Sequence, residues 1–302
     1  MIVADVLNSE RRSSLISLLL SARGTLPQAD LFGIEGDEQN LNSILDEMLS
    51  VVLNREPLYN RWSQEADKNR NFSVPKKPLG RFIEGYLLPL VKTAESHTNC
   101  HGGEPGWDVG RSLATHLPCR SAFSFDLQNA FESLPEHKVY DFYFGLAEEI
   151  QTGERAEERE LVARFLTEIS TVSYQGNSGL PVGSPLSMAL FNRALNPLDQ
   201  GLSRTAEQRG FRYSRWVDDI TLSSPYETGA ESFFGAVDLT ERFHPVSQDK
   251  IFFQGEDEIF LLGSKITSGR RILKNTKEER LERKSPPLDY GILLGRKYDS
   301  WS

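Results

Sequence analysis

The sequence predicts an α+β fold, with helices near the N-terminus and antiparallel strands further along the chain. Residues 9–22 and 39–52 carry apolar side chains at three- and four-residue intervals, which is the spacing of helices that face a core. Residues 121–131 alternate apolar and polar side chains, as a half-buried strand does. Residues 211–222 contain two short β-prone runs joined by a tight turn.

The bulk properties are those of a globular chain in a reducing compartment. Its 302 residues are enough to bury a sizeable core, and its two cysteines leave no disulfide framework. The net charge of −9 argues against a uniformly basic nucleic-acid binder, but Lys and Arg cluster in residues 68–81 and 270–283, which allows a local basic groove. The apolar run at residues 15–20 is too short to span a bilayer. We therefore expect a cytoplasmic protein with no membrane partner.

The remaining segments alternate between expected helices and strands. Helices are expected at residues 135–150, 154–170, 185–209 and 228–243, and strands at residues 246–253 and 259–266. The second of these helices is rich in charge and is expected to form a solvated outer face, and Pro197 is expected to kink the third. A basic helix is expected at residues 275–284 in the tail.

Three carboxylates are the first candidates for chemistry. Asp218 and Asp219 lie at the turn of the expected hairpin, and adjacent acids in a cleft need a counter-charge, which is usually a divalent metal ion. Asp126 lies at the end of an expected strand, where an α/β site would place a metal ligand. From these residues alone the alternatives stay open, because Asp is also common in surface turns and as a helix cap.

A cationic segment is a candidate for binding phosphate. Residues 71–83 are expected to form a β-hairpin with Lys76, Lys77 and Arg81 near its tip. Three cations on a hairpin suit a triphosphate or a nucleic-acid backbone. An ordinary solvated turn is the alternative.

A Gly- and Pro-rich loop at residues 174–192 is a second candidate for binding. Gly183 and Ser184 stand at the start of the following helix, where backbone N–H groups and close approach suit a nucleotide or a template strand. A purely structural loop is the alternative.

Two His-x-x-Cys repeats raise the possibility of a zinc site. His97 with Cys100, and His116 with Cys119, could supply four ligands. Their spacing matches no common zinc module, and core or surface positions are the alternative.

Taken in order, these motifs resemble the palm of reverse transcriptases. Asp126, followed five residues later by Phe131, is similar to the first palm motif. Residues 179–187 (GLPVGSPLS) resemble the LPQG-x-x-S loop of the family, and residues 216–219 (WVDD) resemble its Tyr-x-Asp-Asp motif. Residues 72–81 are similar to the fingers hairpin of bacterial members.

Further motifs are similar to retron-like bacterial reverse transcriptases. They are His101-Gly followed by Arg111-Ser112, Leu198-Asp199-x-x-Leu202, and Gly210-x-x-Tyr213-x-Arg215. The chain also departs from the family pattern, because Val182 stands where most relatives carry Gln and Trp216 stands where they carry Tyr. These departures resemble the heterogeneous enzymes of phage-defence systems, including abortive-infection types.

The resemblance implies a right-hand polymerase of the α+β class. It implies an antiparallel-sheet palm, a helical N-terminal fingers region and a short helical thumb. The implied boundaries are residues 1–120 for the N-terminal helices and fingers, 121–266 for the palm and 267–302 for the reduced thumb.

The resemblance also implies a reaction, which is RNA-directed addition of dNMP to a primer 3′ hydroxyl by a two-metal mechanism with Mg²⁺, or alternatively Mn²⁺. The implied metal ligands and catalytic residues are Asp126, Asp218 and Asp219, with Lys250 as general acid for pyrophosphate. Phe131 is implied as a steric gate against ribose. The other implied substrate-binding residues are Lys76, Lys77, Arg81, Gly183, Ser184, Trp216 and Val217.

The implied partners are an RNA template, nascent DNA and dNTPs, together with a structured noncoding RNA, an accessory protein or a second copy of the chain. Two alternative functions remain. One is non-templated or protein-primed DNA synthesis by the same palm, which the replacement at Val182 would tolerate. The other is a catalytically silent RNA-binding subunit of a defence complex, although clustered carboxylates repel phosphate and argue against it.

Overall fold

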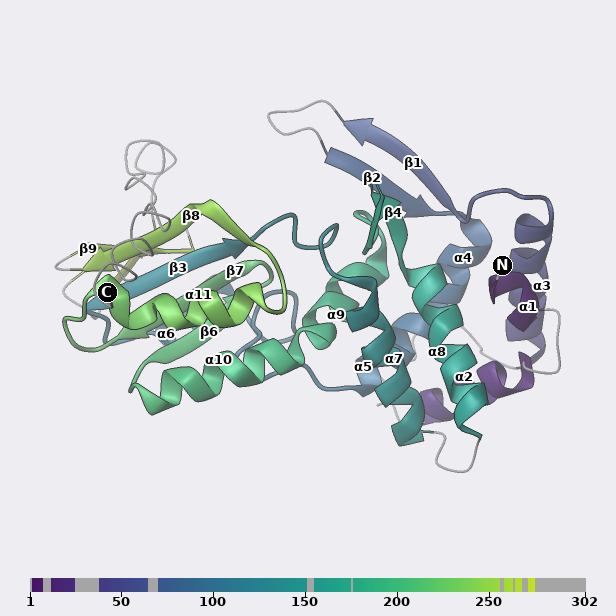
Figure 1. Ribbon diagram of the computed structural model, residues 1–302, viewed down its shortest axis with the longest axis horizontal. Coiled ribbons are helices and arrows are strands. Elements are labelled where there is room, and N and C mark those ends of the chain that lie inside the picture. The colour runs from purple at the N-terminus through teal and green to yellow at the C-terminus, as the bar shows by residue number, and fades with distance from the viewer. Residues whose placement is uncertain are drawn as a thin grey trace, which may run out of the picture. The chain divides into compact units, whose positions relative to one another are not determined.

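The structure is a computed structural model that describes residues 2–7, 12–24, 38–64, 70–150, 155–174, 176–255, 258–262, 264–267 and 271–274 (Figure 1). The chain forms two compact units, each made of two stretches of sequence. We name Met1–Glu95 with Phe131–Ala194 the helical unit, and Ser96–Ala130 with Leu195–Ser302 the sheet unit. The stretch Phe131–Ala194, which lies inside the implied palm boundaries, is therefore grouped with the N-terminal helices.

The helical unit contains helices and two short hairpins. Its helices are α1 (Ile2–Leu7), α2 (Arg12–Gly24), α3 (Glu38–Leu53), α4 (Lys77–Phe82), the π-helix η2 (Ile83–Leu87), α5 (Leu88–Thr93), α7 (Glu136–Ile150), α8 (Ala156–Ser170) and α9 (Pro185–Ala194). The hairpins pair β1 (Tyr59–Gln64) with β2 (Arg70–Pro75), and β4 (Val172–Tyr174) with β5 (Asn177–Gly179). The helices expected near residues 9–22, 39–52 and 135–150 are confirmed apart from their ends.

Helix α8 differs from the expected solvated outer face. It packs against α7 and α1, and one of its sides is buried. Phe165 and Leu166 on that side are fully buried, and Phe165 makes an edge-to-face contact with Phe82 at 6.4 Å between ring centroids. Fully burying one such side chain contributes about 1.5–3 kcal/mol. The charged residues of α8 thus belong to the outer side of an amphipathic helix.

The hairpin expected at residues 71–83 is wrong. Strand β2 pairs with the preceding strand β1, and the chain after β2 enters helix α4 instead of a second strand. Pro78 lies in the first turn of α4, where its missing N–H is not needed because first-turn amides have no partner within the helix. The proline that suggested a turn therefore starts a helix.

The sheet unit is built on a four-stranded antiparallel sheet with the strand order β6-β7-β3-β8. Its strands are β3 (Ser121–Leu127), β6 (Arg212–Trp216), β7 (Asp219–Ser224) and β8 (Val246–Gly255). A second antiparallel sheet joins β9 (Glu258–Leu261), β10 (Ser264–Thr267) and β11 (Arg271–Lys274). The unit also contains helices α6 (Val109–Ala114), α10 (Asn196–Gln208) and α11 (Phe234–Glu241), and the 3-10 helix η3 (Ala230–Phe233).

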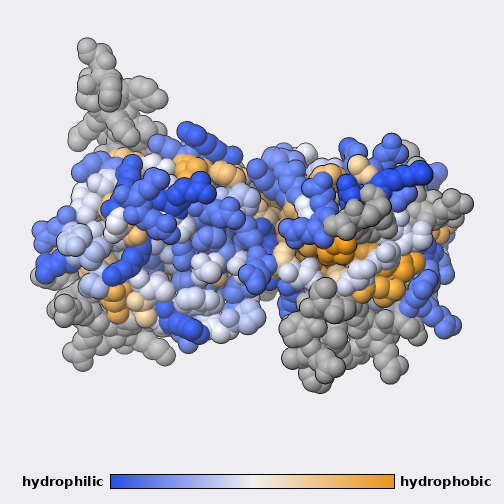
Figure 2. All heavy atoms as spheres, turned by 90° about the horizontal axis from the view of Figure 1, so that it is seen from below, coloured by the Kyte–Doolittle hydropathy of each residue, from blue (hydrophilic) through white to orange (hydrophobic). Residues whose placement is uncertain are grey.

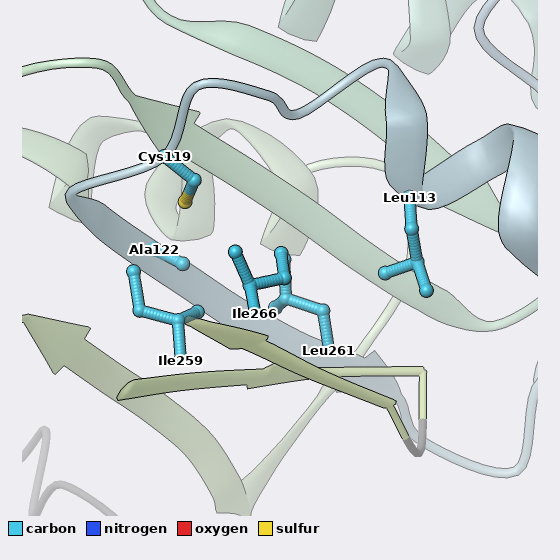
Figure 3. Packing of buried hydrophobic residues seen from close by; sticks show 6 residues of the cluster. All are labelled: Leu113, Cys119, Ala122, Ile259, Leu261 and Ile266. Carbon is cyan, nitrogen blue, oxygen red and sulfur yellow. The ribbon is translucent and has the colours of Figure 1, made fainter. Parts of the chain in front are cut away.

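Strand β3 lies at the centre of this unit and is covered on both faces. Phe123 points toward η3, and its ring stacks on Phe233 at 5.5 Å between centroids. The adjacent Ala122 points to the other face, where it packs with Leu113 of α6 and with apolar residues of β9 and β10 such as Ile259 (Figure 3). Because successive side chains on a strand point to opposite faces, β3 is held by two separate apolar contacts.

The α+β prediction is confirmed, and the strands expected at residues 121–131, 211–222 and 246–253 are present. The strand expected at residues 259–266 is instead the pair β9 and β10, with Leu262 at a φ of 48° between them. The basic helix expected at residues 275–284 lies outside the described residues, as does most of the implied thumb.

None of the helices in the described ranges has both the length and the apolar character that crossing a membrane requires.

On the face shown in Figure 2, hydrophilic side chains predominate over the sheet unit, with smaller apolar patches among them.

Candidate active site

Three aspartates gather at one end of the four-stranded sheet. Asp126 on β3 and Asp219 on β7 are direct partners in the antiparallel register, which places their Cβ atoms about 4.5–5.5 Å apart. Asp218 lies in the turn between β6 and β7. Its backbone carbonyl accepts a hydrogen bond from the Leu127 N–H at 2.9 Å, so the turn is attached to the end of β3. Asp218 and Asp219 are adjacent in the sequence, and Asp126 precedes Asp218 by 92 positions. The fold thus brings three carboxylates from two distant segments together.

Ionisation of Asp219 would place a third negative charge beside Asp126 and Asp218, and the surroundings of Asp219 strongly disfavour it. Burial, followed by the charges of Asp126 and Asp218, raises the pKa of Asp219 from 3.8 to about 8. Lys250 on β8 opposes this shift, and its ammonium group donates a hydrogen bond to the Asp126 carboxylate. That hydrogen bond is the main cause of a raised pKa at Lys250. The site therefore holds more acid than its single lysine can neutralise.

This donor set fits a hard divalent cation. Carboxylate oxygens are the ligands that Mg²⁺ and Mn²⁺ prefer, and an opposite charge stabilises acids that repel one another. Within the described residues, no three His, Cys, Asp or Glu side chains are arranged so that they could already hold one metal ion. Asp126 is instead engaged by the ammonium group of Lys250. Lys250 thus supplies the counter-charge in this arrangement.

The zinc hypothesis is wrong for the His-x-x-Cys repeats, all of whose members are described. Both ring nitrogens of His116 are engaged, by Ser223 Oγ at 2.8 Å and by Ser214 Oγ at 2.7 Å. The Cys119 thiol donates to a backbone carbonyl, and burial raises its pKa to about 11. Burial likewise lowers the pKa of His116 to about 3. These groups are neutral parts of the core.

The turn that carries the aspartates contains a strained residue. Val217 has a φ of 59°, a region that β-branched residues rarely occupy and that costs about 1–3 kcal/mol. Trp216, the last residue of β6, pairs with Asp219 across the turn and is partly buried. The strain therefore falls between the last residue of one strand and the first acid.

The Gly- and Pro-rich loop belongs to the helical unit and is attached to it at several points. The carbonyl of Val182 accepts from Ser73 N of β2 at 2.7 Å, and the N–H of Val182 donates to the Tyr174 hydroxyl at 3.1 Å. Gly183 follows with a φ of 102°, a conformation suited to glycine, and it is exposed. Ser184, in contrast, is buried. The loop therefore presents a glycine, and not the hydroxyl of Ser184, to solvent.

Phe131 is joined to the same loop. Its carbonyl accepts from Leu180 N at 2.7 Å, and its ring makes an edge-to-face contact with Phe191 of α9 at 5.1 Å between centroids. A Cβ atom on Gly179 would lie 2.2 Å from the Glu132 carbonyl oxygen, so only glycine fits there. The backbone around Phe131 is thereby held against the loop.

Two of the three expected phosphate-binding cations, Lys77 and Arg81, lie on helix α4, and Lys76 is the N-cap residue before it. Two of the three are in surface ion pairs. Lys76 contacts Glu56 at 2.8 Å, Arg81 contacts Glu47, and Lys77 is exposed. A surface ion pair contributes about 0.2–1 kcal/mol, because both charges remain largely hydrated. These cations can therefore exchange their carboxylate partners for a more strongly charged phosphate.

The sequence reasoning missed a groove beside the β1–β2 hairpin. Trp62 and Phe72 stack at 4.4 Å between centroids, and Trp62 is 50% exposed. They line a hollow of about 340 Å³, together with Arg61, Ser63, Asn71, Ser73, Ser173 and Tyr174. Strand β1 has the sequence YNRWSQ, which lacks regular alternation of polar and apolar residues, so periodicity gave no signal for it.

Comparisons with known proteins agree with the motif pattern. Residues 63–266 match the family described as reverse transcriptase (RNA-dependent DNA polymerase). The retron Mx65 reverse transcriptase of Myxococcus xanthus is 28% identical over 171 residues, which cover 54% of this chain and 39% of that protein. The retron Ec86 reverse transcriptase of Escherichia coli is 28% identical over 156 residues, which cover 51% of this chain and 44% of that protein. The matches thus span less than half the length of these two relatives.

Solved structures share the fold. Telomerase from Candida albicans, in complex with a TWJ fragment of telomeric RNA, matches with a TM-score of 0.54 at 13% identity, covering 79% of this chain and 51% of that one. Apo telomerase from Candida Tropicalis, truncated from its C-terminal domain, matches with a TM-score of 0.51 at 13% identity, covering 72% of this chain and 55% of that one. Together with the mixed helices and antiparallel sheet, these matches confirm the right-hand polymerase fold.

Proposed function

Since the chain belongs to the reverse transcriptase family, we propose that it is an RNA-directed DNA polymerase that adds dNMP to a primer 3′ hydroxyl. The observation that carries this proposal is the pairing of Asp126 with Asp219 beside the Asp218 turn. A protein that only binds RNA has no use for three clustered acids, because they repel phosphate. A nucleotidyltransferase uses such acids to hold divalent cations.

The residues of the sheet unit divide the chemistry among them. Asp126 and Asp218 would hold two Mg²⁺ ions, with Asp219 beside them. Ions bound there would supply positive charge to the attacking and departing oxygens. Lys250 is held as an ammonium group by Asp126 and so carries a proton at neutral pH. It is the residue that we propose to protonate the departing pyrophosphate.

The helical unit supplies the groups that select and bind the substrates. Arg81 offers a planar fork of N–H donors, and Lys76 and Lys77 offer point charges, for the triphosphate of an incoming dNTP. Phe131 is the proposed steric gate, because a phenyl ring leaves no room for a ribose 2′ hydroxyl. The exposed ring of Trp62 suits an unpaired base of an RNA template, which stacks on aromatic side chains.

The experiment that tests the proposal is incorporation of labelled dNTP by purified protein with Mg²⁺, with and without a primed RNA template. We expect incorporation that needs the template and is lost in Asp218→Asn. The matched control is Asp249→Asn, an exposed aspartate on β8, which should retain incorporation. Incorporation that persists in Asp218→Asn would remove the catalytic assignment. If the wild type binds RNA but incorporates no dNTP, the alternative function, a catalytically silent RNA-binding subunit, is favoured.

One observation favours a second candidate function, which is synthesis without a template. Both backbone groups of Val182 are engaged, by Tyr174 and Ser73, so this position offers an incoming nucleotide only an apolar side chain. The family pattern has Gln here, whose amide can donate and accept hydrogen bonds. Incorporation that is independent of the template sequence, and that becomes template-dependent in Val182→Gln, would establish this second function.

The biological setting that we propose is antiphage defence, with a structured noncoding RNA, an accessory protein or a second copy of the chain as partner. The similarity to retron reverse transcriptases supports this setting. Phage plaque counts on cells that carry the wild type or Asp218→Asn test it, and the variant should lose protection. Sequencing of nucleic acid that copurifies with the wild type would identify the template or the partner RNA.

A further inference from the structure

Three sequence motifs that have no part in the chemistry above lie next to the Asp218-Asp219 turn. They are the segment with His101-Gly102 and Ser112, the segment with Leu198-Asp199, and the segment with Tyr213 and Arg215. We propose that Gly102, Asp199 and Arg215 are positioning residues, which together brace this turn and hold its two acids in one place. The proposal rests on the proposed function, because it assigns these residues to the metal-binding carboxylates of that site.

Arg215 is the centre of the brace. Its side chain is fully buried, and its fork binds Asp199 of α10 twice, from Nε to Oδ1 at 2.8 Å and from Nη2 to Oδ2 at 2.6 Å. The third nitrogen, Nη1, donates to the Val217 carbonyl at 2.8 Å. The hydroxyl of Tyr213 also donates to Asp199 Oδ1. A guanidinium group can serve a carboxylate and a carbonyl at once in this planar geometry, and a lysine cannot.

The buried pair needs a reason other than stability. Taking two charges out of water costs more than their attraction usually returns, and apolar residues of similar size often serve a fold as well. An apolar pair at positions 199 and 215 could fill the same space. It could not donate a hydrogen bond to the Val217 carbonyl, and this hydrogen bond attaches the pair to the turn.

Gly102 closes the brace from the other side. The Arg215 carbonyl accepts from His101 N at 2.8 Å and from Gly102 N at 3.5 Å, so this segment lies against the end of β6. A Cβ atom on Gly102 would lie 2.5 Å from the Val217 nitrogen and 2.8 Å from the Trp216 carbonyl carbon. Both of these are backbone atoms, which cannot move aside without moving the turn. Only glycine permits the contact.

The residues that hold Gly102 in place include His101 and Ser112 of the same motif. The ring of His101 stacks on Trp107 at 3.5 Å between centroids, and its Nδ1 lies 2.8 Å from Ser112 Oγ. These contacts tie the glycine segment to the start of helix α6. Gly102 therefore contacts the turn from a segment whose position is fixed by the contacts of His101.

Together these contacts hold the left-handed backbone of Val217. Its carbonyl is bound by Arg215, and its nitrogen lies against Gly102. Asp218 is the next residue, so any rotation of the Val217 backbone displaces its carboxylate. The carbonyl of Asp218 is bound to Leu127 N on the far side. The turn is thus held from both sides, which is the condition under which a strained residue persists.

The test compares Gly102→Ala with Gly145→Ala, whose added Cβ would meet nothing within 4 Å. The first readout is binding of Tb³⁺, an oxygen-seeking ion, detected by luminescence sensitised by Trp216, which lies two residues before Asp218. Loss of the signal in Asp218→Asn identifies the site. We expect Gly102→Ala to bind Tb³⁺ at least about tenfold more weakly and to lower kcat about 100-fold, the scale of a 1 Å misplacement, with the KM for dNTP unchanged. Gly145→Ala should match the wild type in both.

A second variant covers the case in which Gly102→Ala does not fold. Val217→Gly relieves the left-handed strain, so it should fold at least as well as the wild type while letting the turn move. We expect it to weaken Tb³⁺ binding by a similar factor. Unchanged Tb³⁺ affinity in Val217→Gly, or in a folded Gly102→Ala, would overturn the brace. Because Tb³⁺ binding does not require turnover, this result is distinguishable from a failure of the polymerase proposal, which incorporation alone would show.

Discussion

The raised pKa of Asp219 predicts that the metal-free protein loses stability as the pH rises. In the unfolded chain this carboxyl loses its proton near pH 3.8, whereas in the folded protein it keeps the proton up to about pH 8. Between these values the folded state binds more protons than the unfolded state. The contribution of Asp219 to the free energy of unfolding therefore falls as the pH rises through this window, and this contribution is constant above and below it.

The difference between the two pKa values sets the magnitude. It is about four pH units, and at about 1.4 kcal/mol per unit this amounts to a ceiling of roughly 6 kcal/mol. Part of the surface of Asp219 remains accessible to solvent, so screening and local relaxation reduce the measured value. A loss of about 2 kcal/mol would still be a large fraction of the stability of an ordinary domain.

The perturbation is Asp219→Asn, which keeps the shape of the side chain and removes its titration. Urea unfolding followed by circular dichroism, in EDTA and from pH 5 to 9, measures the free energy of unfolding of both proteins. We expect the variant to be more stable than the wild type at pH 9 and the difference to shrink toward pH 5. Added Mg²⁺ should stabilise the wild type most at high pH, because it binds the ionised acids of the folded state.

Two comparisons decide whether the reasoning holds. Asp249→Asn removes an exposed aspartate from the same sheet and should follow the wild-type profile. Parallel pH profiles for the wild type and Asp219→Asn would refute the reasoning, because they would mean that Asp219 is ionised in the folded protein throughout this range.

Four further outcomes follow from the structure. Gly179→Ala should lower the free energy of unfolding by about 3 kcal/mol or more, since its Cβ would overlap a backbone carbonyl, whereas Gly145→Ala should be neutral or slightly stabilising in the same urea titration. Burial lowers the pKa of His116 to about 3, so stability should fall as the pH drops below about 6.5, and His116→Gln should flatten that part of the profile. Phe131→Ala should raise incorporation of NTP relative to dNTP in single-nucleotide assays. Trp62→Ala should weaken binding of single-stranded RNA by a factor of about 5 to 150 in fluorescence anisotropy, which corresponds to one stacked base.

The parts of the candidate site that could be predicted from the sequence are those encoded locally. The alternating pattern before Asp126 and the two β-prone runs around Asp218 place both acids at strand ends. The register of β3 with β7 then pairs Asp126 with Asp219, the residue that follows Asp218. Sequence periodicity served well here because each element is short, regular and closed by a turn.

Elements that depend on distant partners could not be predicted in this way. The strand at residues 70–75 was recognisable, but its partner β1 precedes it, and a proline after it is equally compatible with a turn and with the first turn of a helix. The charge of α8 concealed a buried side, because burial depends on what packs against a helix. Likewise, the sequence shows Asp199 and Arg215 sixteen residues apart, but not that one helix and one strand bring their side chains together.

Val217 is the point at which local preference and tertiary structure disagree. A β-branched residue between Trp216 and Asp218 favours continuation of the strand, yet the backbone there is left-handed. Such a conflict survives only where the surrounding contacts outweigh it, and the hydrogen bond from Arg215 and the close approach of Gly102 are contacts of that kind. A glycine at position 217 would satisfy the turn without help, but it would also let the turn adopt other conformations. A rigid residue in a conformation that it does not prefer is therefore the better choice for holding two acids still, provided that the brace remains intact.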